Sequence, residues 1–387
     1  MREVAIVAAV RTAVARENGA LRDLPPHRYG AGVIKAAVER ARCDPNEIED
    51  VIFGNVQSRG GNIARLCALE AGLPVDVPGL TVDRQCGSAL EAINTAASRI
   101  MAGAGEVFVA GGVESMTRAP YILERPASAY SRVPPKFLRP QLSPEQIGNP
   151  EMGITAENVA ERFSISREEQ DAFAFRSQQL AAAALAEGRF REQIVPVQVP
   201  SGKESVTFAV DEHPRLDTTL ERLAKLPPAF KPGGTVTAGS SSGINDGASA
   251  AVLMEAGLAR ARGLEILGFV RAWAVAGVDP NVMGIGPVPA VRKLLQRTGM
   301  SLDQIGLVEL NEAFAAQALA CIRELGLEMA RVNVNGGAIA LGHPLGATGG
   351  ILTAKLLYEM KRTSTRFGMV TACIGGGQGI ATLFERP

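Results

Sequence analysis

The sequence predicts an α/β protein made of two similar halves with an insertion between them. Short, almost wholly apolar segments alternate with alanine-rich helical stretches, which is typical of a sheet covered by helices on both faces. A gapless internal similarity relates residues 33–52 to residues 290–309. The chain has 387 residues, 46% of them hydrophobic, and is therefore large and apolar enough for more than one compact domain.

The expected strands are short apolar runs that end in polar or glycine-rich turns, at 4–10, 51–53, 107–110, 308–310 and 369–372. The internal similarity pairs a helix and the strand after it in each half. Helix-turn-strand units can resemble one another by composition alone. A second correspondence, a helix followed by VFVAGGVE (107–114) against a helix followed by GMVTACIGGG (368–377), favours a real duplication.

An irregular segment separates the two halves. Residues 120–150 have no sustained period and contain Pro126, Pro134, Pro135, Pro140 and Pro144. Ser166 and Glu169 then form a capping box that starts a helix ending at Gly188. We expect an inserted domain at 117–244, an N-terminal half at 1–116 with 245–266, and a C-terminal half at 267–387.

Composition excludes several classes of function. Forty basic and forty acidic residues give a formal net charge of zero, so we expect neither nucleic acid nor a membrane surface as a partner. No apolar run approaches the length of a membrane span, and the first residues lack a signal-peptide core. The cysteines are odd in number, far apart and without CxxC spacing: Cys43, Cys67, Cys86, Cys321 and Cys373. They favour reduced thiols in the cytoplasm over disulfides or a zinc site.

Cys86 and Cys373 are the two cysteines in a context that suggests chemistry. Cys86 lies where a strand gives way to a helix, and the positive end of the helix dipole is expected to lower the pKa of its thiol. A buried residue filling a tight turn would explain this local sequence equally well. Cys373 precedes a glycine-rich turn whose N–H groups could stabilise an oxyanion, although that turn with a buried thiol needs no function. The other three cysteines lie on helical stretches without such a context and are assigned to packing or to the surface.

His343 lies between Gly342 and Pro344 in GGAIALGHPLGATGG. Proline restricts the residue before it, so this histidine belongs to a special loop and not to a regular helix or strand. Asn311 follows the expected strand 308–310, at a place where α/β proteins often carry functional groups. His27 and His213 have polar neighbours and are expected at the surface.

Two cysteines, a histidine and an asparagine suit one reaction type. A thiolate accepts an acyl group, a histidine activates it, a second acid or base moves a proton α to a thioester carbonyl, and donors hold the oxyanions. This is the Claisen condensation of acyl thioesters or its reversal.

The whole chain resembles the thiolase family. The motifs QCGSALEAI, VAGGVESM, MGITAENVAERF, TAGSSSGINDGASA, NEAFAAQ, GGAIALGHPLGATGG and CIGGGQG occur in the family's order. The resemblance implies an α/β fold of two βαβαβαββ halves in five layers, αβαβα, with an inserted loop domain. It also implies a homodimer or homotetramer, with coenzyme A as a substrate and no permanently bound cofactor or metal.

The resemblance also implies roles for individual residues. Cys86 would be the nucleophile, His343 its base, and Cys373 the second acid and base. Asn311 would hold a water beside His343 in one oxyanion hole, and the backbone N–H groups of Cys86 and Gly375 would form another. The coenzyme A residues would be Arg215, Phe230, Ala238 and Ser242, with Met152 and Phe314 at the thioester end.

The substrate is the open part of the prediction. Short-chain members typically have histidine before the Met-Gly pair, whereas this chain has Glu151. We expect an acetyl-CoA C-acyltransferase that cleaves or forms 3-ketoacyl-CoA, with an acetoacetyl-CoA-specific acetyltransferase or a 3-oxoadipyl-CoA thiolase as alternatives.

Three rivals from other classes fit the sequence less well. A decarboxylating ketosynthase is expected to have histidine where Cys373 stands. A cysteine hydrolase would leave Asn311 and Cys373 unexplained. A non-catalytic acyl-CoA-binding relative would be expected to lack one of the catalytic residues.

Overall fold

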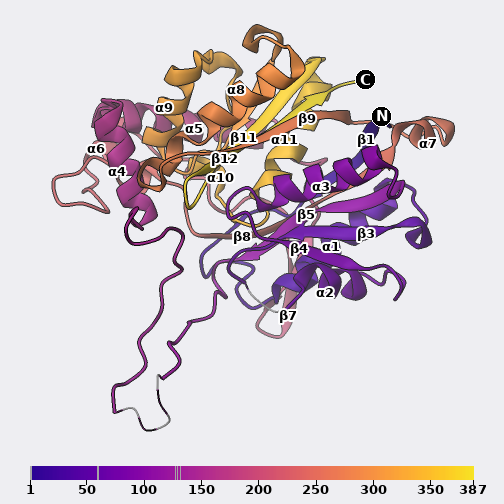
Figure 1. Cartoon of the computed structure of the whole chain (residues 1–387), viewed down its shortest axis with the longest axis horizontal. Helices are drawn as coiled ribbons and strands as arrows, with labels where there is room; N and C mark the ends of the chain where they lie inside the picture. Colours follow the sequence, from indigo (N-terminus) through magenta and orange to yellow (C-terminus); the bar gives the residue numbers. More distant parts are fainter. Residues whose placement is uncertain (1, 59–60, 127, 129, 131) are drawn as a thin grey trace.

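The computed structural model describes residues 2–58, 61–126, 128, 130 and 132–387 (Figure 1). Its N-terminal half alternates strands and helices as the sequence predicts. In chain order these elements are β1 (Val4–Arg11), β2 (Ala15–Arg16), α1 (Pro26–Arg40), β3 (Asp50–Gly54), α2 (Ile63–Glu70), β4 (Gly79–Val82), α3 (Ser88–Ala102), β5 (Val107–Ser115) and, after the insertion, β8 (Asn245–Glu255). Their main strands lie in the order β4-β3-β5-β8-β1, with β2 paired to β8.

The C-terminal half repeats this arrangement. Helix α7 (Ala256–Ala261) leads into it, followed by β9 (Gly268–Gly277), α8 (Pro287–Thr298), β10 (Leu307–Leu310), α9 (Ala315–Leu325), α10 (Ala338–Leu341), α11 (Thr348–Thr363), β11 (Phe367–Ile374) and β12 (Gln378–Glu385). Its strands lie in the order β10-β11-β12-β9. A single parallel bridge from Val308 to Val332 stands where the N-terminal half has β4. The predicted correspondence of 33–52 with 290–309 therefore matches α1-β3 to α8-β10.

Three hydrophobic clusters define the layers. One packs α1 and α2 on the N-terminal sheet, one packs α3 and α11 between the two sheets, and one packs α8 and α9 on the C-terminal sheet. Figure 1 shows these layers from α8 and α9 at the top to α1 and α2 at the bottom. The five-layer αβαβα arrangement is thus present. The two sheets also join, because β1 and β9 pair at Ala5–Phe269 and Ile6–Gly268.

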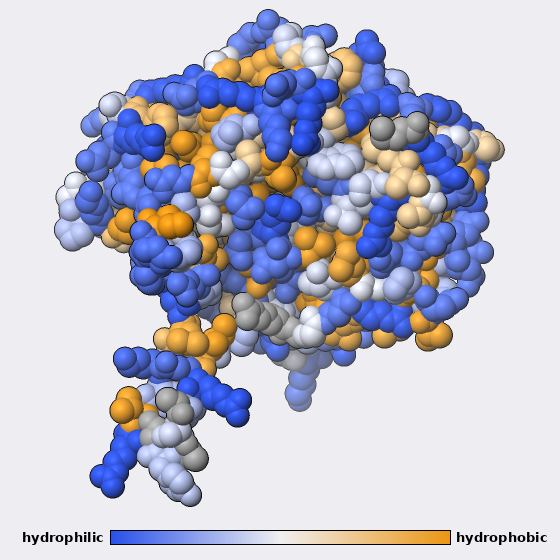
Figure 2. Space-filling view, viewed as in Figure 1, coloured by the Kyte–Doolittle hydropathy of each residue, from blue (hydrophilic) through white to orange (hydrophobic). Residues whose placement is uncertain are grey.

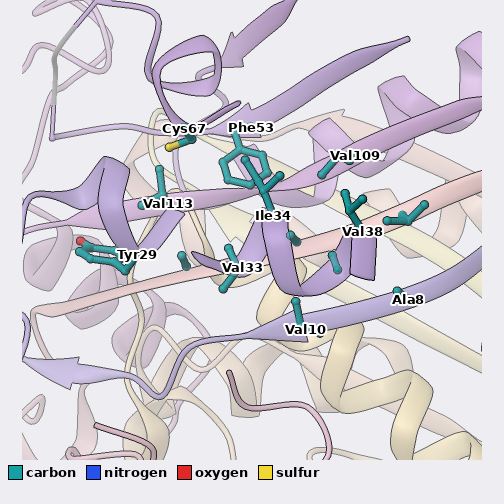
Figure 3. Close-up of a cluster of buried hydrophobic side chains, with 14 of the residues drawn as sticks. Ala8, Val10, Tyr29, Val33, Ile34, Val38, Phe53, Cys67, Val109 and Val113 are labelled. Carbon is teal, nitrogen blue, oxygen red and sulfur yellow. The ribbon is translucent and has the colours of Figure 1, made fainter. Parts of the chain in front are cut away.

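Helix α1 shows why these layers form. Tyr29, Val33, Ile34 and Val38 recur at helical spacing, and Figure 3 shows them directed at side chains of the N-terminal strands, such as Phe53. Burying each large aliphatic side chain contributes about 1.5–3 kcal/mol. The helix therefore gains most of its stability from this packing and not from its own propensity.

The insertion contributes to both halves instead of forming a separate core. Its elements are α4 (Met152–Arg162), α5 (Arg167–Ala186), β6 (Val197–Ser201), β7 (Glu204–Phe208) and α6 (Leu220–Ala224). Helix α5 starts with the predicted Ser166–Glu169 capping box and packs into the C-terminal cluster, whereas the β6–β7 hairpin packs into the N-terminal one. The apolar side chains of these parts complete the cores of the two halves.

A long arm extends from the body between β5 and α4 (Figures 1 and 2). The described residues of 120–150 form no helix or strand, as predicted, apart from an isolated bridge between Leu123 and Phe137. The base of the arm covers the site described next. None of the helices in the described part of the chain is long and apolar enough to cross a membrane.

Candidate active site

The loops before α3 and α11 meet at the centre of the molecule. A Cβ atom on Gly54 would lie 2.5 Å from the carbonyl oxygen of Gly346 and 2.6 Å from the backbone nitrogen of Ala89. Only a glycine allows this approach of three backbone segments. It brings the loop that carries Cys86 against the loop that carries His343.

Cys86 lies in a tight turn before α3. Gln85 has a positive φ of 46°, which a residue with a side chain rarely adopts, and Cys86 itself is 9% exposed. The backbone N–H groups of Gly375 and of Cys86 lie close enough to its sulfur to lower the pKa of the thiol. These are the two donors predicted for an oxyanion hole.

The predicted lowering of the Cys86 pKa is wrong for this structure. Burial raises the pKa of the Cys86 thiol to about 11, against the lowering effect of the two N–H groups. Desolvation of the thiolate outweighs the dipole of α3, since Cys86 precedes the N-cap residue Gly87 and is enclosed by protein. At neutral pH Cys86 is therefore a protonated thiol.

Cys373 is a fully buried residue of β11 and lies near Cys86. Burial raises the pKa of the Cys373 thiol well above its usual range, and the nearby Cys86 raises it further. Cys373 packs in a small apolar cluster with Phe314 and Met152. Three of the predicted site residues thus lie together although they come from distant parts of the chain.

His343 has a defined orientation. The Thr348 hydroxyl donates to the Pro344 carbonyl at 2.9 Å, so its oxygen is free to accept from His343 Nδ1 at 2.6 Å. This network puts the imidazole proton on Nδ1 and leaves Nε2 as an acceptor for the Asn311 amide at 3.3 Å. Burial lowers the pKa of His343 to about 4, so the ring is neutral and Nε2 can take a proton.

Asn311 connects His343 with β11. Its backbone N–H donates to Thr371, two residues before Cys373. Its side chain is fully buried, and within the part of the chain that the structure describes its Oδ1 atom has no hydrogen-bond partner. A buried carbonyl oxygen without a partner is costly, which is the condition under which a site holds a water or a substrate atom.

The histidine segment is anchored along its whole length. Buried side chains bind its backbone at five points: Gly336 O with Lys355, Gly337 N with Ser177, Ile339 N with Glu312, His343 N with Asn245, and Gly346 N with Glu114. The segment GGAIALGHPLGATGG was singled out in the sequence, but these partners were not. They lie elsewhere in the chain. Glu114, Asn245 and Glu312 belong to the quoted motifs, where they had no assigned role, and Ser177 and Lys355 lie outside them.

A cavity of about 390 Å³ opens at Cys86. Its wall includes Gly375 and Met152 and continues under the arm with apolar residues, among them Ile122, Leu138 and Leu142. Polar groups such as Gln85 and Glu151 also line it. An acyl chain attached to the Cys86 sulfur would extend into this space.

A second cavity, of about 660 Å³, contains all four predicted coenzyme A residues: Arg215, Phe230, Ala238 and Ser242. Phe230 contacts Phe314 edge to face, with 5.9 Å between ring centroids. Because Phe314 packs against Cys373, this contact links the second cavity to the two cysteines.

The expectation that His213 is a surface residue is wrong. It is half-buried in the wall of the second cavity, and burial, with Arg215 and Arg16 nearby, lowers its pKa to about 4. Its polar sequence neighbours misled the prediction, because polar residues are not all exposed here: Asp211 is itself buried in an ion pair with Arg11. No group of three His, Cys, Asp or Glu residues in the described ranges could hold a metal ion.

Comparison with known families identifies the chain. The family model for the thiolase N-terminal domain matches residues 4–257, and that for the thiolase C-terminal domain matches residues 264–386. The chain belongs to the thiolase family. A decarboxylating ketosynthase or an unrelated cysteine hydrolase is thereby excluded as a family assignment.

Several thiolases are similar over the whole length. An acetyl-CoA acetyltransferase of Pseudomonas aeruginosa is 49% identical, with all of both chains covered, and a beta-ketoadipyl-CoA thiolase of Acinetobacter baylyi is 46% identical with the same coverage. Among solved structures, Bacillus anthracis acetyl-CoA acetyltransferase has a TM-score of 0.95 at 43% identity and human mitochondrial 3-ketoacyl-CoA thiolase 0.94 at 40%. Each covers 100% of this chain, with 99% of the solved chain covered. The predicted thiolase fold is confirmed.

Proposed function

We propose that this protein is an acetyl-CoA C-acyltransferase. It cleaves 3-ketoacyl-CoA with coenzyme A to acetyl-CoA and a shortened acyl-CoA, or catalyses the reverse condensation, through an acyl group on Cys86. The observation that carries this proposal is that Cys86 lies in the wall of a cavity with Gly375, near the buried thiol of Cys373, while Nε2 of His343 is left as an acceptor.

In cleavage, the Cys86 sulfur attacks the ketone carbon C3 while its proton moves to Nε2 of His343. The raised pKa of Cys86 and the lowered pKa of His343 favour a neutral pair at rest, so proton transfer accompanies attack. The C2–C3 bond then breaks, and the electron pair on C2 takes the proton of Cys373. Acetyl-CoA leaves, and acyl-Cys86 remains.

Coenzyme A completes the reaction. Its thiol gives a proton to the Cys373 thiolate, attacks the acyl carbonyl and releases Cys86, which recovers its proton from His343. The N–H groups of Cys86 and Gly375 donate hydrogen bonds to the oxyanion that forms at the acyl carbon. A water held by Asn311 together with His343 serves the second oxyanion, and the partnerless Oδ1 atom of Asn311 supports this role.

The two cavities would bind different parts of the substrate, coenzyme A in one and the acyl chain in the other. Arg215 would lie near the adenine, Phe230 and Ala238 along the pantetheine, and Ser242 would hydrogen-bond to it. Met152 and Phe314 would flank the thioester. The apolar cavity under the arm takes the acyl chain, and its volume favours an acyl group longer than acetyl.

Two narrower substrate specificities are alternatives to this general one, acetoacetyl-CoA alone or 3-oxoadipyl-CoA. The relatives' names support both, since they include acetyl-CoA acetyltransferases and a beta-ketoadipyl-CoA thiolase. Thiolysis of acetoacetyl-CoA, longer straight-chain 3-ketoacyl-CoA and 3-oxoadipyl-CoA by the purified protein would separate them. We expect acetyl-CoA formation with activity beyond the four-carbon substrate. No thiolysis across the whole series would refute the proposed function.

We further propose a homodimer or homotetramer located in the cytoplasm, and we retain the division into 1–116 with 245–266, 117–244 and 267–387. Strand β4 is an edge strand of the sheet, and its four residues are half-buried. An edge strand can pair with another chain, which supports self-association. The five cysteines, all without disulfides, are compatible with a reducing compartment. Light scattering of the purified protein gives the oligomeric state.

A further inference from the structure

Two polar side chains, Asn245 and His213, lie between the second cavity and His343. Neither has a role in the reaction as proposed above. Both hold the segment that carries His343, Asn245 at His343 itself and His213 at Ile339.

Asn245 is fully buried at the start of β8. Its Oδ1 atom accepts from the backbone N–H of His343 at 2.9 Å. Its Nδ2 group donates to the Ala15 carbonyl at 3.0 Å and lies 3.4 Å from Nδ1 of His213. Each polar atom of the amide thus has a fixed partner, which leaves the side chain one orientation.

The backbone before His343 is shaped to this amide. Gly342 has a φ of 98°, and a Cβ atom there would lie 2.6–2.7 Å from the Asn245 side chain. Glycine is required both for the conformation and for the approach. The amide and the turn therefore fix the direction in which the chain enters His343, and with it the position of the imidazole.

His213 supports the amide from the cavity side. Its ring lies against the Ile339 backbone, which raises its pKa slightly, and it offers Nδ1 to Asn245, which requires a neutral ring. A Cβ atom on Gly243 would lie 2.2 Å from its Cε1 atom, so the ring fills the space beside that glycine. His213 and Ile339 both line the second cavity.

We propose that Asn245 and His213 are positioning residues that fix His343 from the wall of the coenzyme A cavity. This inference rests on the proposed function, since it assumes that His343 is the base. Neither side chain touches the reacting atoms. They act on the reaction only by fixing the backbone at His343 and at Ile339, and with it the position of the imidazole.

The test compares Asn245→Leu, His213→Leu and the conservative His213→Gln with the wild-type protein in acetoacetyl-CoA thiolysis. A misplaced catalytic group commonly costs about 10²-fold. We expect kcat to fall about 10- to 100-fold in Asn245→Leu and less in His213→Leu, with His213→Gln recovering part of the loss. Single-turnover acylation of Cys86 at saturating acetyl-CoA should fall by the same factor as kcat.

Asn94→Leu is the matched control. Asn94 is a buried asparagine of α3 that accepts at 2.9 Å from Thr382, a residue of β12 that has no hydrogen bond to the His343 segment. A loss of kcat in this variant equal to that in Asn245→Leu, at similar thermal stability, would mean that Asn245 acts only through stability and would overturn the inference.

Two further outcomes are decisive. Should Asn245→Leu fail to fold, the half-buried His213 variants carry the test, and a kcat within about twofold of wild type in His213→Leu contradicts the inference. If the wild-type protein itself shows no thiolysis, the proposed function is refuted. Failure of the proposed function is thus distinguishable from failure of the inference about Asn245 and His213.

Discussion

The two halves have one topology but different chemistry at corresponding positions. Cys86 and His343 are separated in sequence by the same number of residues as the aligned positions 33 and 290 of the internal similarity. Cys86 therefore precedes α3 as His343 precedes the equivalent helix α11. Asn55 follows β3 as Asn311 follows β10. Glu114 lies near the end of β5, and Cys373 near the end of β11.

The difference lies in whether the polar groups are satisfied. Glu114 accepts from the backbone of Val56, Gln57, Ser58 and Gly346 and from the side chains of Asn55 and Ser58. Asn311 keeps a buried oxygen without a partner among the described residues, and Cys373 is surrounded by apolar groups. A saturated network stabilises structure, whereas unsatisfied groups remain for a substrate. In the proposed mechanism the N-terminal half supplies the nucleophile and the frame around Glu114, and the C-terminal half supplies the proton-transfer groups.

The largest expected effect is on the cysteines. Cys86→Ala should abolish acyl transfer to the protein and lower thiolysis at least about 10⁴-fold, because the proposed acyl group is carried on the Cys86 sulfur. Cys373→Ala should still be acylated by acetyl-CoA but turn over very poorly. Mass spectrometry of the labelled protein checks this, and label on Cys373 in the wild type would reverse the two roles.

Asn311→Ala should lower kcat about 10²- to 10³-fold, the usual cost of losing one oxyanion-hole group. Asn55→Ala is the matched change in the other half. It removes amide bonds to Val113, Ser58 and Glu114, so it should destabilise the protein and leave kcat within about threefold. Steady-state kinetics and urea unfolding of both variants give the comparison. Equal kinetic losses would show that the halves are not specialised in this way.

Glu114→Gln should lower the free energy of unfolding by about 1–3 kcal/mol. The new amide group would face N–H donors that the carboxylate accepts, leaving buried donors unpaired. Because one of these donors is Gly346, kcat should fall as well, but less than in Asn311→Ala. Urea unfolding measures the first effect. Unchanged stability would contradict the assignment of Glu114 to the frame.

The smallest effect concerns pH. The pKa of His213 is about 4 in the folded protein, below its ordinary value of 6.5, mainly through burial and then through Arg215 and Arg16, with Glu212 opposing. Its contribution to stability is therefore complete above about pH 6.5 and is lost as pH falls towards 4. His213→Asn should reduce the slope of unfolding free energy against pH in this window by up to one proton. An unchanged slope would mean that the ring is solvated.

Local patterns in the sequence predicted much of this molecule. Apolar runs located β1, β3, β5, β10 and β11, and the Ser166 capping box located the start of α5. The internal similarity indicated the repeated topology. These features depend on neighbouring residues and on period, which a sequence displays directly.

Contacts between distant residues were decided by the tertiary structure. The helix dipole suggested a lowered pKa for Cys86, but enclosure by protein raised it, and polar neighbours suggested an exposed His213, although its ring lies in a cavity wall. The anchors Asn245 and Glu114 lie far from His343 in sequence. By itself the sequence determined the elements, their repeat and the residue types for acyl transfer. Burial and long-range hydrogen bonding, which depend on how layers pack, decided protonation states and the residues that hold His343 in place.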